Sequence, residues 1–258
     1  MPEKPPIPDH SEKNCEESRL DKIFELNPEL LEIGTKEQYR EYLKTIFPES
    51  KIRDVVFHDT EGDWFKIEGF DEGKIGKTDY GYYGKGFYFH TQEDITGSYG
   101  ERTFVSVLNI QNPKYNIDTH TVGQRILSGQ NPEESKKIAT TWLSDEIAYY
   151  ENEITKLNKG EIDKHHDIPE GMDFEDYWEN ERLSRIDAIS KLIQDYHEQL
   201  KNIDALISEY YSHDGFLTGD DTSKYGEIIV RQPEQIHTLG SESDKEGFRH
   251  FVSQELVS

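Results

Sequence analysis

The sequence predicts an α+β fold, because two kinds of pattern occupy different parts of the chain. Short runs rich in valine, phenylalanine and tyrosine, punctuated by glycine, fall between residues 52 and 117 and again after residue 213. Between residues 132 and 211 the apolar residues instead recur at steps of three and four. The chain has 258 residues, 33% of them hydrophobic, which is enough for one decorated domain or two small ones.

Composition excludes several classes of protein. The 29 basic and 53 acidic residues give a formal net charge of −24, which disfavours general binding to a phosphate backbone. The single cysteine, Cys15, excludes an internal disulfide and a multi-cysteine metal site, and suits a reducing compartment. No run of about 18 apolar residues or hydrophobic leader is present, so we expect no membrane span. We expect a cytoplasmic protein, or one delivered into a host cell without a cleavable signal peptide.

The N-terminal part predicts a tail followed by helices. Residues 1–17 are rich in proline and charge, with too little apolar surface to order them, and we expect a flexible tail. Residues 18–48 predict one or two amphipathic helices that end before Pro48. The apolar residues that set the period are Leu20, Ile23, Phe24, Leu26, Leu30, Leu31, Tyr39, Tyr42, Leu43 and Ile46.

Residues 49–258 predict the main domain. Strands are expected at 54–58, 86–90 and 104–110, and later at 214–217 and 225–230. Seven glycines between Gly62 and Gly86 predict a long irregular loop over 59–86, and loops of that length are usually functional. The final segment, 248–257, fits either a strand or a short helix.

An insertion interrupts this domain at residues 131–211. Its helical period predicts two long helices joined by an acidic linker at 159–173, hence an antiparallel helical hairpin. Residues 131–210 hold 20 acidic and 9 basic side chains, a net charge of −11. Such a surface is suited to a basic partner, and partner recognition, steric cover and structural bracing are alternative roles for it.

Three short motifs carry the functional prediction. His58 ends the first β-type run; the run GKGFYF at 84–89 is followed, eleven residues after Tyr88, by Tyr99; and the run DTSKYGEIIV at 221–230 contains Glu227. Taken singly, each is also typical of ordinary structure: a strand-end histidine, a glycine turn before a packed aromatic strand, and a solvated strand start.

Together the three motifs resemble the catalytic domain of the poly(ADP-ribose) polymerases and the diphtheria-toxin-like ADP-ribosyltransferases. The resemblance covers about residues 50–118 and 213–240, and its wording is closest to phage and bacterial members, which suggests a toxin, effector or host-modifying enzyme. It implies a split β-sheet core and a catalytic triad of His58, Tyr88 and Glu227. NAD⁺ is then the substrate, and no metal is needed.

The resemblance also implies a role for each residue. Tyr88 and Tyr99 stack on the cationic nicotinamide ring, an interaction worth roughly 0.5 to 2 kcal/mol. The backbone of Asp59 and the hydroxyl of Thr96 bind the carboxamide, and His58 positions a hydroxyl of the adenosine-side ribose. A further residue, Gly86, belongs to the NAD-binding set.

Glu227 has a role that physical chemistry also supports. When neutral nicotinamide departs, positive charge develops on the ribose, so a nearby carboxylate stabilises the transition state more than the ground state. At about 4 Å and an effective dielectric constant of about 20, the attraction is on the order of 4 kcal/mol, or about three decades in rate.

Two positions differ from the residues that the family usually has in these motifs. Asp59 follows the histidine where the family usually has glycine, and Tyr225 stands two residues before Glu227, where arginine-directed toxins have Glu or Gln. The acceptor therefore stays open between a protein side chain, a nucleic-acid base and a small molecule. The alternatives are an NAD glycohydrolase, a catalytically silent module that binds NAD or ADP-ribose, and a protein-interaction module.

Overall fold

The structure of this chain is a computed structural model that confirms the mixed α+β class. The residues it describes are 20–60, 70–71, 73, 75, 81, 83–91, 102–117, 120–161, 174–218 and 226–255. The chain divides into two compact units. Unit 1 comprises Met1–Gly81, Gly86–Ile117 and His213–Ser258, and unit 2 comprises Tyr82–Lys85 and Asp118–Ser212.

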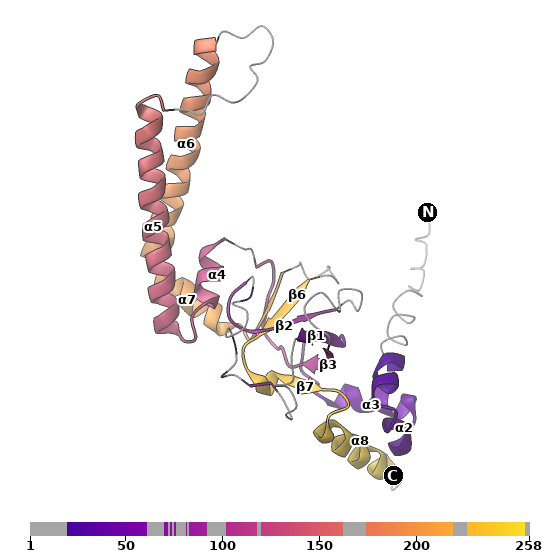
Figure 1. The fold of residues 1–258 in the computed structure, drawn as a ribbon. Helices are drawn as coiled ribbons and strands as arrows, with labels where there is room; N and C mark the ends of the chain where they lie inside the picture. The colour runs from indigo at the N-terminus through magenta and orange to yellow at the C-terminus, as the bar shows by residue number, and fades with distance from the viewer. Residues whose placement is uncertain are drawn as a thin grey trace, which may run out of the picture. The chain divides into compact units, whose positions relative to one another are not determined.

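A seven-stranded mixed sheet forms the centre of unit 1 (Figure 1). Its strands are β1 (Val56–Thr60), β2 (Phe87–His90), β3 (Arg102–Leu108), β4 (Pro113–Lys114), β5 (Gly215–Leu217), β6 (Glu227–Val230) and β7 (Ile236–Thr238). Their order across the sheet is β4-β5-β6-β2-β1-β3-β7. The pair β4–β5 is parallel and the other neighbours are antiparallel. Strands β4 and β7 were not predicted from the sequence, because Pro-Lys and Ile-His-Thr lack the run of apolar or aromatic residues that marks the other strands.

Alternation along the strands builds two cores, one on each face of this sheet. Apolar side chains on one face pack with the N-terminal and C-terminal helices. This core includes Phe24, Tyr39, Tyr42, Phe57, Val105, Val107, Leu239 and Phe248. The opposite face carries a second core, which includes Val56, Phe70, Phe87, Phe89, Leu108, Ile228 and Val230. Burial on both faces fixes the register of the central strands, because a slip of one residue would exchange the two sets of side chains.

The ladder between β1 and β2 is short. Within these two strands only Phe57 and His90 are registered partners, whereas β1 pairs with β3 from Val56 to Thr60. Strand β2 pairs with β6 along all four of its residues. Among the described residues, the sheet therefore consists of two parts, β4-β5-β6-β2 and β1-β3-β7, joined through one registered pair.

Helices precede the sheet, as the apolar period predicts. They form three separate segments. Residues 20–26 are helical and are followed by α2 (Leu30–Ile33) and α3 (Lys36–Thr45). A capping box begins α3: the Thr35 hydroxyl accepts from the Gln38 backbone N–H, and the Gln38 side chain accepts from the Thr35 N–H. The expected tail at 1–17 lies outside the described residues.

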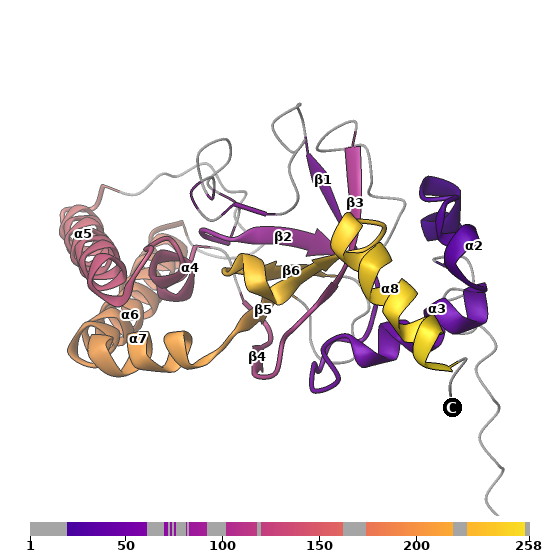
Figure 2. The same cartoon turned by 90° about the horizontal axis from the view of Figure 1, so that it is seen from below.

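The C-terminal segment, for which the sequence allowed either a strand or a short helix, is helical. It forms α8 (Glu242–Glu255), and Figure 2 shows α8 beside α3 in unit 1. Phe248 of α8 makes an edge contact with Tyr39 of α3, with ring centroids 4.9 Å apart. As a helix, this segment buries Phe248 in the core that contains Tyr39 and Tyr42.

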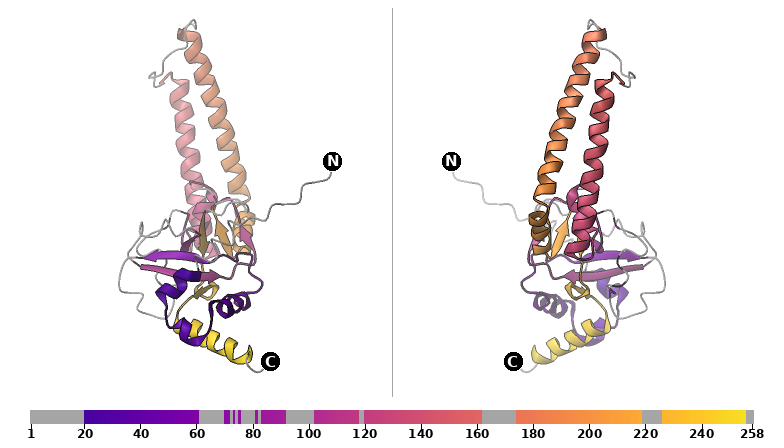
Figure 3. Two further views of the ribbon diagram at one scale, coloured as in Figure 1. Left: turned by 90° about the vertical axis from the view of Figure 1, so that its right-hand side faces the viewer. Right: turned by 90° about the vertical axis from the view of Figure 1, so that its left-hand side faces the viewer.

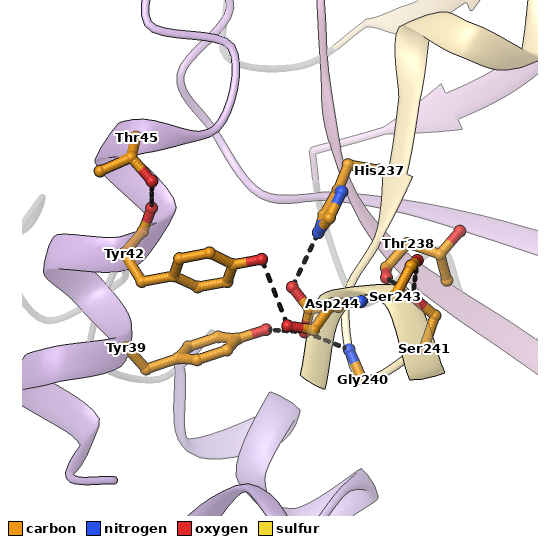
Figure 4. A network of polar contacts seen from close by, with 9 residues as sticks. All are labelled: Tyr39, Tyr42, Thr45, His237, Thr238, Gly240, Ser241, Ser243 and Asp244. Carbon is orange, nitrogen blue, oxygen red and sulfur yellow. Dashed lines mark hydrogen bonds and ion pairs between the residues drawn. The ribbon is translucent and has the colours of Figure 1, made fainter. Parts of the chain in front are cut away.

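A buried carboxylate joins α3, β7 and the start of α8 (Figure 4). Asp244 is 0% exposed; its Oδ2 accepts from the Tyr39 hydroxyl at 2.6 Å and the Gly240 N–H at 2.8 Å, and its Oδ1 accepts from His237 Nε2 at 2.7 Å. The hydroxyl of Tyr42 donates to the Asp244 carbonyl at 3.2 Å. Burial, followed by the charge of Asp244, raises the pKa of Tyr39 far above its usual value, so the phenol stays a donor.

Replacing Asp244 tests how much this cluster contributes. In Asp244→Asn an amide N–H₂ replaces one carboxylate oxygen, so either the Tyr39 hydroxyl and the Gly240 N–H lose their acceptor, or His237 must change tautomer and present Nε2 as an acceptor. We expect the free energy of unfolding to fall by about 3 to 5 kcal/mol in urea denaturation. The control is Asp187→Asn, because that side chain is 66% exposed and pairs only with Lys191 on the same helix. Equal stability of the two variants would contradict a structural role for Asp244.

Unit 2 is helical, with α4 (Val122–Leu127), α5 (Pro132–Asn158), α6 (Phe174–Lys201) and α7 (Ile203–Ser212). Asn131 caps α5 by accepting from the Glu134 N–H at 3.0 Å, and Pro132 occupies the first turn, where its missing N–H costs nothing. Figure 3 shows α5 and α6 side by side. Between them the rings of Trp142 and Tyr196 are in contact, with centroids 5.6 Å apart. The linker expected at 159–173 is described only as far as residue 161.

Two features of unit 2 differ from the sequence prediction. The second long helical period breaks at Asn202 into α6 and α7, and the short helix α4 was not predicted. Both features follow from one apolar core, in which α4 and α7 pack against α5. Its buried residues are Ile126, Ala139, Leu143, Ile203 and Ile207. None of the described helices has an apolar stretch of the length that a membrane crossing requires.

Candidate functional site

The three residues of the expected triad lie on three strands that are neighbours in the sheet. His58 is on β1, Tyr88 on β2 and Glu227 on β6, and the order across the sheet is β6-β2-β1. These strands come from parts of the chain that are far apart in sequence. Thr96 and Tyr99, expected to bind the carboxamide and the nicotinamide ring, lie outside the described residues.

Register determines which of these side chains share a face. Glu227 is the direct partner of His90, and His90 is the direct partner of Phe57, so these residues and Tyr88 point to one face of the sheet. His58 follows Phe57 in sequence and therefore points to the opposite face. The structure brings Tyr88 and Glu227 onto a common face and does not place the imidazole of His58 there.

The His58 side chain fills the opposite face at the end of the β1–β2 ladder. Its ring contacts Phe70 and Phe89, with centroids 5.1 and 5.4 Å away. The Nδ1 atom lies 2.7 Å from the Tyr88 carbonyl oxygen, so the imidazole crosses from β1 to the backbone of β2 where the registered pairing stops.

The same environment fixes the protonation of His58. Burial lowers the pKa of the imidazole, and this outweighs the Tyr88 carbonyl and Asp59, which act in the other direction. At neutral pH the ring is therefore uncharged. Because a carbonyl can only accept, the proton sits on Nδ1.

Glycines bring backbone close to the aromatic strand at two points. Gly81 has φ +63°, and a Cβ there would lie 2.2 Å from the Tyr88 hydroxyl, so only glycine leaves room for the phenol ring. At Gly86 a Cβ would lie 2.3 Å from Ile229 Cγ2 and 3.0 Å from the Val230 carbonyl oxygen. Gly86, expected in the NAD-binding set, thus has a packing role in allowing β2 to start against β6.

Glu227 is anchored through its backbone at the first position of β6. Its N–H donates to the Thr218 hydroxyl at 2.9 Å, and its carbonyl accepts from the Thr218 N–H at 3.1 Å. The side chain is half-buried, so it is partly accessible to a ligand. Thr218 was not singled out from the sequence, because a lone threonine beyond a strand gives no distinguishing signal.

Asp59 has a polar environment that the sequence did not reveal. Its carboxylate accepts from the Thr103 hydroxyl at 2.7 Å through Oδ1, and Oδ2 lies 3.4 Å from His90 Nε2. The Asp59 and His90 side chains are 1% and 11% exposed. The signal available in the sequence was the spacing of Tyr88 and His90, two residues apart on one strand, which puts both on one face.

Among the described residues, no group of three or more histidine, cysteine, aspartate or glutamate side chains is arranged to hold a metal ion.

Comparison with known proteins assigns no family to this chain. No family model matches it, and neither the curated proteins nor the solved structures contain a significant match.

The state of His58 predicts a pH dependence of stability. Its pKa is lowered in the folded protein from an unfolded value near 6.5, so the unfolded chain binds the proton first as pH falls. Stability is then fully present above that value and is lost as pH falls from it toward the folded pKa. We measure the free energy of unfolding in urea at about pH 7.5 and at about pH 5. The decrease between these two pH values should be smaller for His58→Gln than for the wild type.

The control for this comparison is His197→Gln, which replaces an exposed histidine on α6. Its stability should change with pH as that of the wild type does. An identical pH dependence in the wild type and in His58→Gln would contradict a buried, neutral His58.

Proposed function

We propose that this protein is an NAD-dependent ADP-ribosyltransferase that cleaves the nicotinamide–ribose bond and transfers ADP-ribose to an acceptor. The observation that carries the proposal is the convergence of the three sequence motifs on adjacent strands. Motifs centred on residues 58, 88 and 227 fall on β1, β2 and β6, which are consecutive in the sheet. Unrelated packing motifs have no reason to meet in this way.

The short β1–β2 ladder supports a ligand site between the two parts of the sheet. Beyond the Phe57–His90 pair, the described residues of β1 and β2 have no further registered partners, and His58 bonds to the Tyr88 carbonyl at this point. A dinucleotide bound on the face shared by β2 and β6 meets the phenol of Tyr88 and the carboxylate of Glu227. His58, on the opposite face, supports this site through its hydrogen bond to the Tyr88 backbone.

The charges of the substrate during the reaction support different roles for Glu227 and Tyr88. A cationic ribose is stabilised by a fixed anion, and Glu227 is the carboxylate that β6 directs to the face of Tyr88. An aromatic face such as Tyr88 binds a flat cation, and nicotinamide is cationic only before the bond breaks. Loss of neutral nicotinamide thus moves the positive charge from the ring to the sugar, where the carboxylate stabilises it.

Asp59, the departure from the family's wording, is compatible with this proposal. Its carboxylate is hydrogen-bonded to Thr103 and lies beside His90, so the negative charge is held against the protein. The backbone N–H and C=O of residue 59 have the same chemistry whether the residue is glycine or aspartate.

The central test is Glu227→Gln. Because the amide keeps the size and a hydrogen-bonding group but loses the charge, we expect nicotinamide release to fall by about three decades. The dissociation constant for NAD⁺, measured by calorimetry, should change by less than about threefold. The control is Glu234→Gln, an exposed glutamate after the same strand, which should keep the wild-type rate. Wild-type turnover by Glu227→Gln would refute the assignment.

The fate of the ribosyl group separates transferase from glycohydrolase. Nicotinamide release that is unchanged by cell extract indicates water as the acceptor, whereas label from NAD⁺ that becomes attached to macromolecules indicates transfer. Protease and nuclease treatment of the labelled extract then assigns the acceptor. Binding of NAD⁺ without any nicotinamide release would instead indicate a silent binding module.

A further inference from the structure

We propose that His90, held by Asp59, is the positioning residue of the Glu227 carboxylate. The proposal rests on the function proposed above and adds a residue pair that the three motifs do not contain. It follows from a row of polar side chains that crosses four neighbouring strands on one face: Thr103 on β3, Asp59 on β1, His90 on β2 and Glu227 on β6.

The first step is the anchoring of Asp59. Thr103 is its registered partner on β3, and the threonine hydroxyl donates to Oδ1 at 2.7 Å. The side chain is 1% exposed, so the carboxylate has few alternative orientations. With one oxygen fixed by Thr103, the other faces His90 Nε2 at 3.4 Å.

The second step is the orientation of His90. Its ring stacks on Phe57, with centroids 6.0 Å apart and an interplanar angle of 26°, and its side chain is 11% exposed. Stacking fixes the plane of the ring, and the carboxylate of Asp59 determines which edge faces β1.

The third step is the register between His90 and Glu227. They are direct partners in the antiparallel β2–β6 ladder, so their Cβ atoms lie about 4.5 to 5.5 Å apart on the same face. His90 is thus flanked on this face by Asp59 from β1 and by Glu227 from β6. It separates their charges and restricts the rotamers of Glu227, so that the carboxylate is already placed when the ribose becomes positive.

A double-mutant cycle of His90 and Asp59 tests this inference through nicotinamide release from NAD⁺. His90→Phe keeps a flat ring on Phe57 but removes both nitrogens, and we expect kcat to fall about 30-fold with KM changed less than about threefold. His90→Gln, which can still donate to Asp59, should recover part of that loss. If His90→Phe does not fold, His90→Gln and Asp59→Asn still form the cycle.

Asp59→Asn is close to isosteric and can still accept from Thr103. Its amide N–H₂ then faces His90 Nε2 and forces that nitrogen to become an acceptor. We expect kcat to fall by about tenfold in the wild-type background and to change little further in the His90→Gln background, because Asp59 acts through His90.

The matched control is His237→Gln, which alters the other histidine–carboxylate pair of unit 1, where Nε2 lies 2.7 Å from Asp244. It should lower the melting temperature and leave kcat unchanged. Full kcat in both His90 variants of a wild-type-active enzyme would overturn this inference alone, and so would additive effects of Asp59→Asn and His90→Gln. No NAD⁺ turnover by the wild-type chain would overturn the proposed function and this inference with it.

Discussion

Strand β2 pairs with β1 on one side and β6 on the other, and its four residues decide which distant parts of the chain share a face. Phe87 and Phe89 enter a buried core, so Tyr88 and His90 must point to the other face. That face then receives Glu227 from β6, opposite His90. The candidate site therefore depends on apolar burial behind it, because the two phenylalanines hold the register that brings the polar residues together.

Two buried carboxylates of unit 1 have the same kinds of neighbouring groups. Asp244 has His237 and the hydroxyl of Tyr39 as partners, and Asp59 has His90 and the hydroxyl of Thr103. In each case a hydroxyl and an imidazole offset the cost of removing a charge from water. The two clusters differ in their surroundings. Asp244 joins α3, β7 and α8, whereas the Asp59 cluster shares its face with Tyr88 and Glu227, which is why we assign a functional role only to the latter.

Elements with a clear apolar pattern were predicted well, and short elements without one were not. The N-terminal helices, the strands around residues 58, 88 and 105 and the two long helices stand where apolar spacing places them. Strands β4 and β7 and helix α4 are two to six residues long, and their positions depend on partners remote in sequence. The C-terminal segment fitted both strand and helix locally, and packing of Phe248 on Tyr39 favours the helix.

For the candidate site, the sequence by itself determined three short motifs, because runs of neighbouring residues are local and readable. The resemblance of these motifs to the ADP-ribosyltransferases singled out His58, Asp59, Tyr88 and Glu227 as candidates. Only the tertiary structure decided that Asp59 lies beside His90 and that the imidazole of His58 faces away from Tyr88 and Glu227. These relations follow from the register between strands that are far apart along the chain. That register is fixed by burial on both faces of the sheet, which no local pattern records.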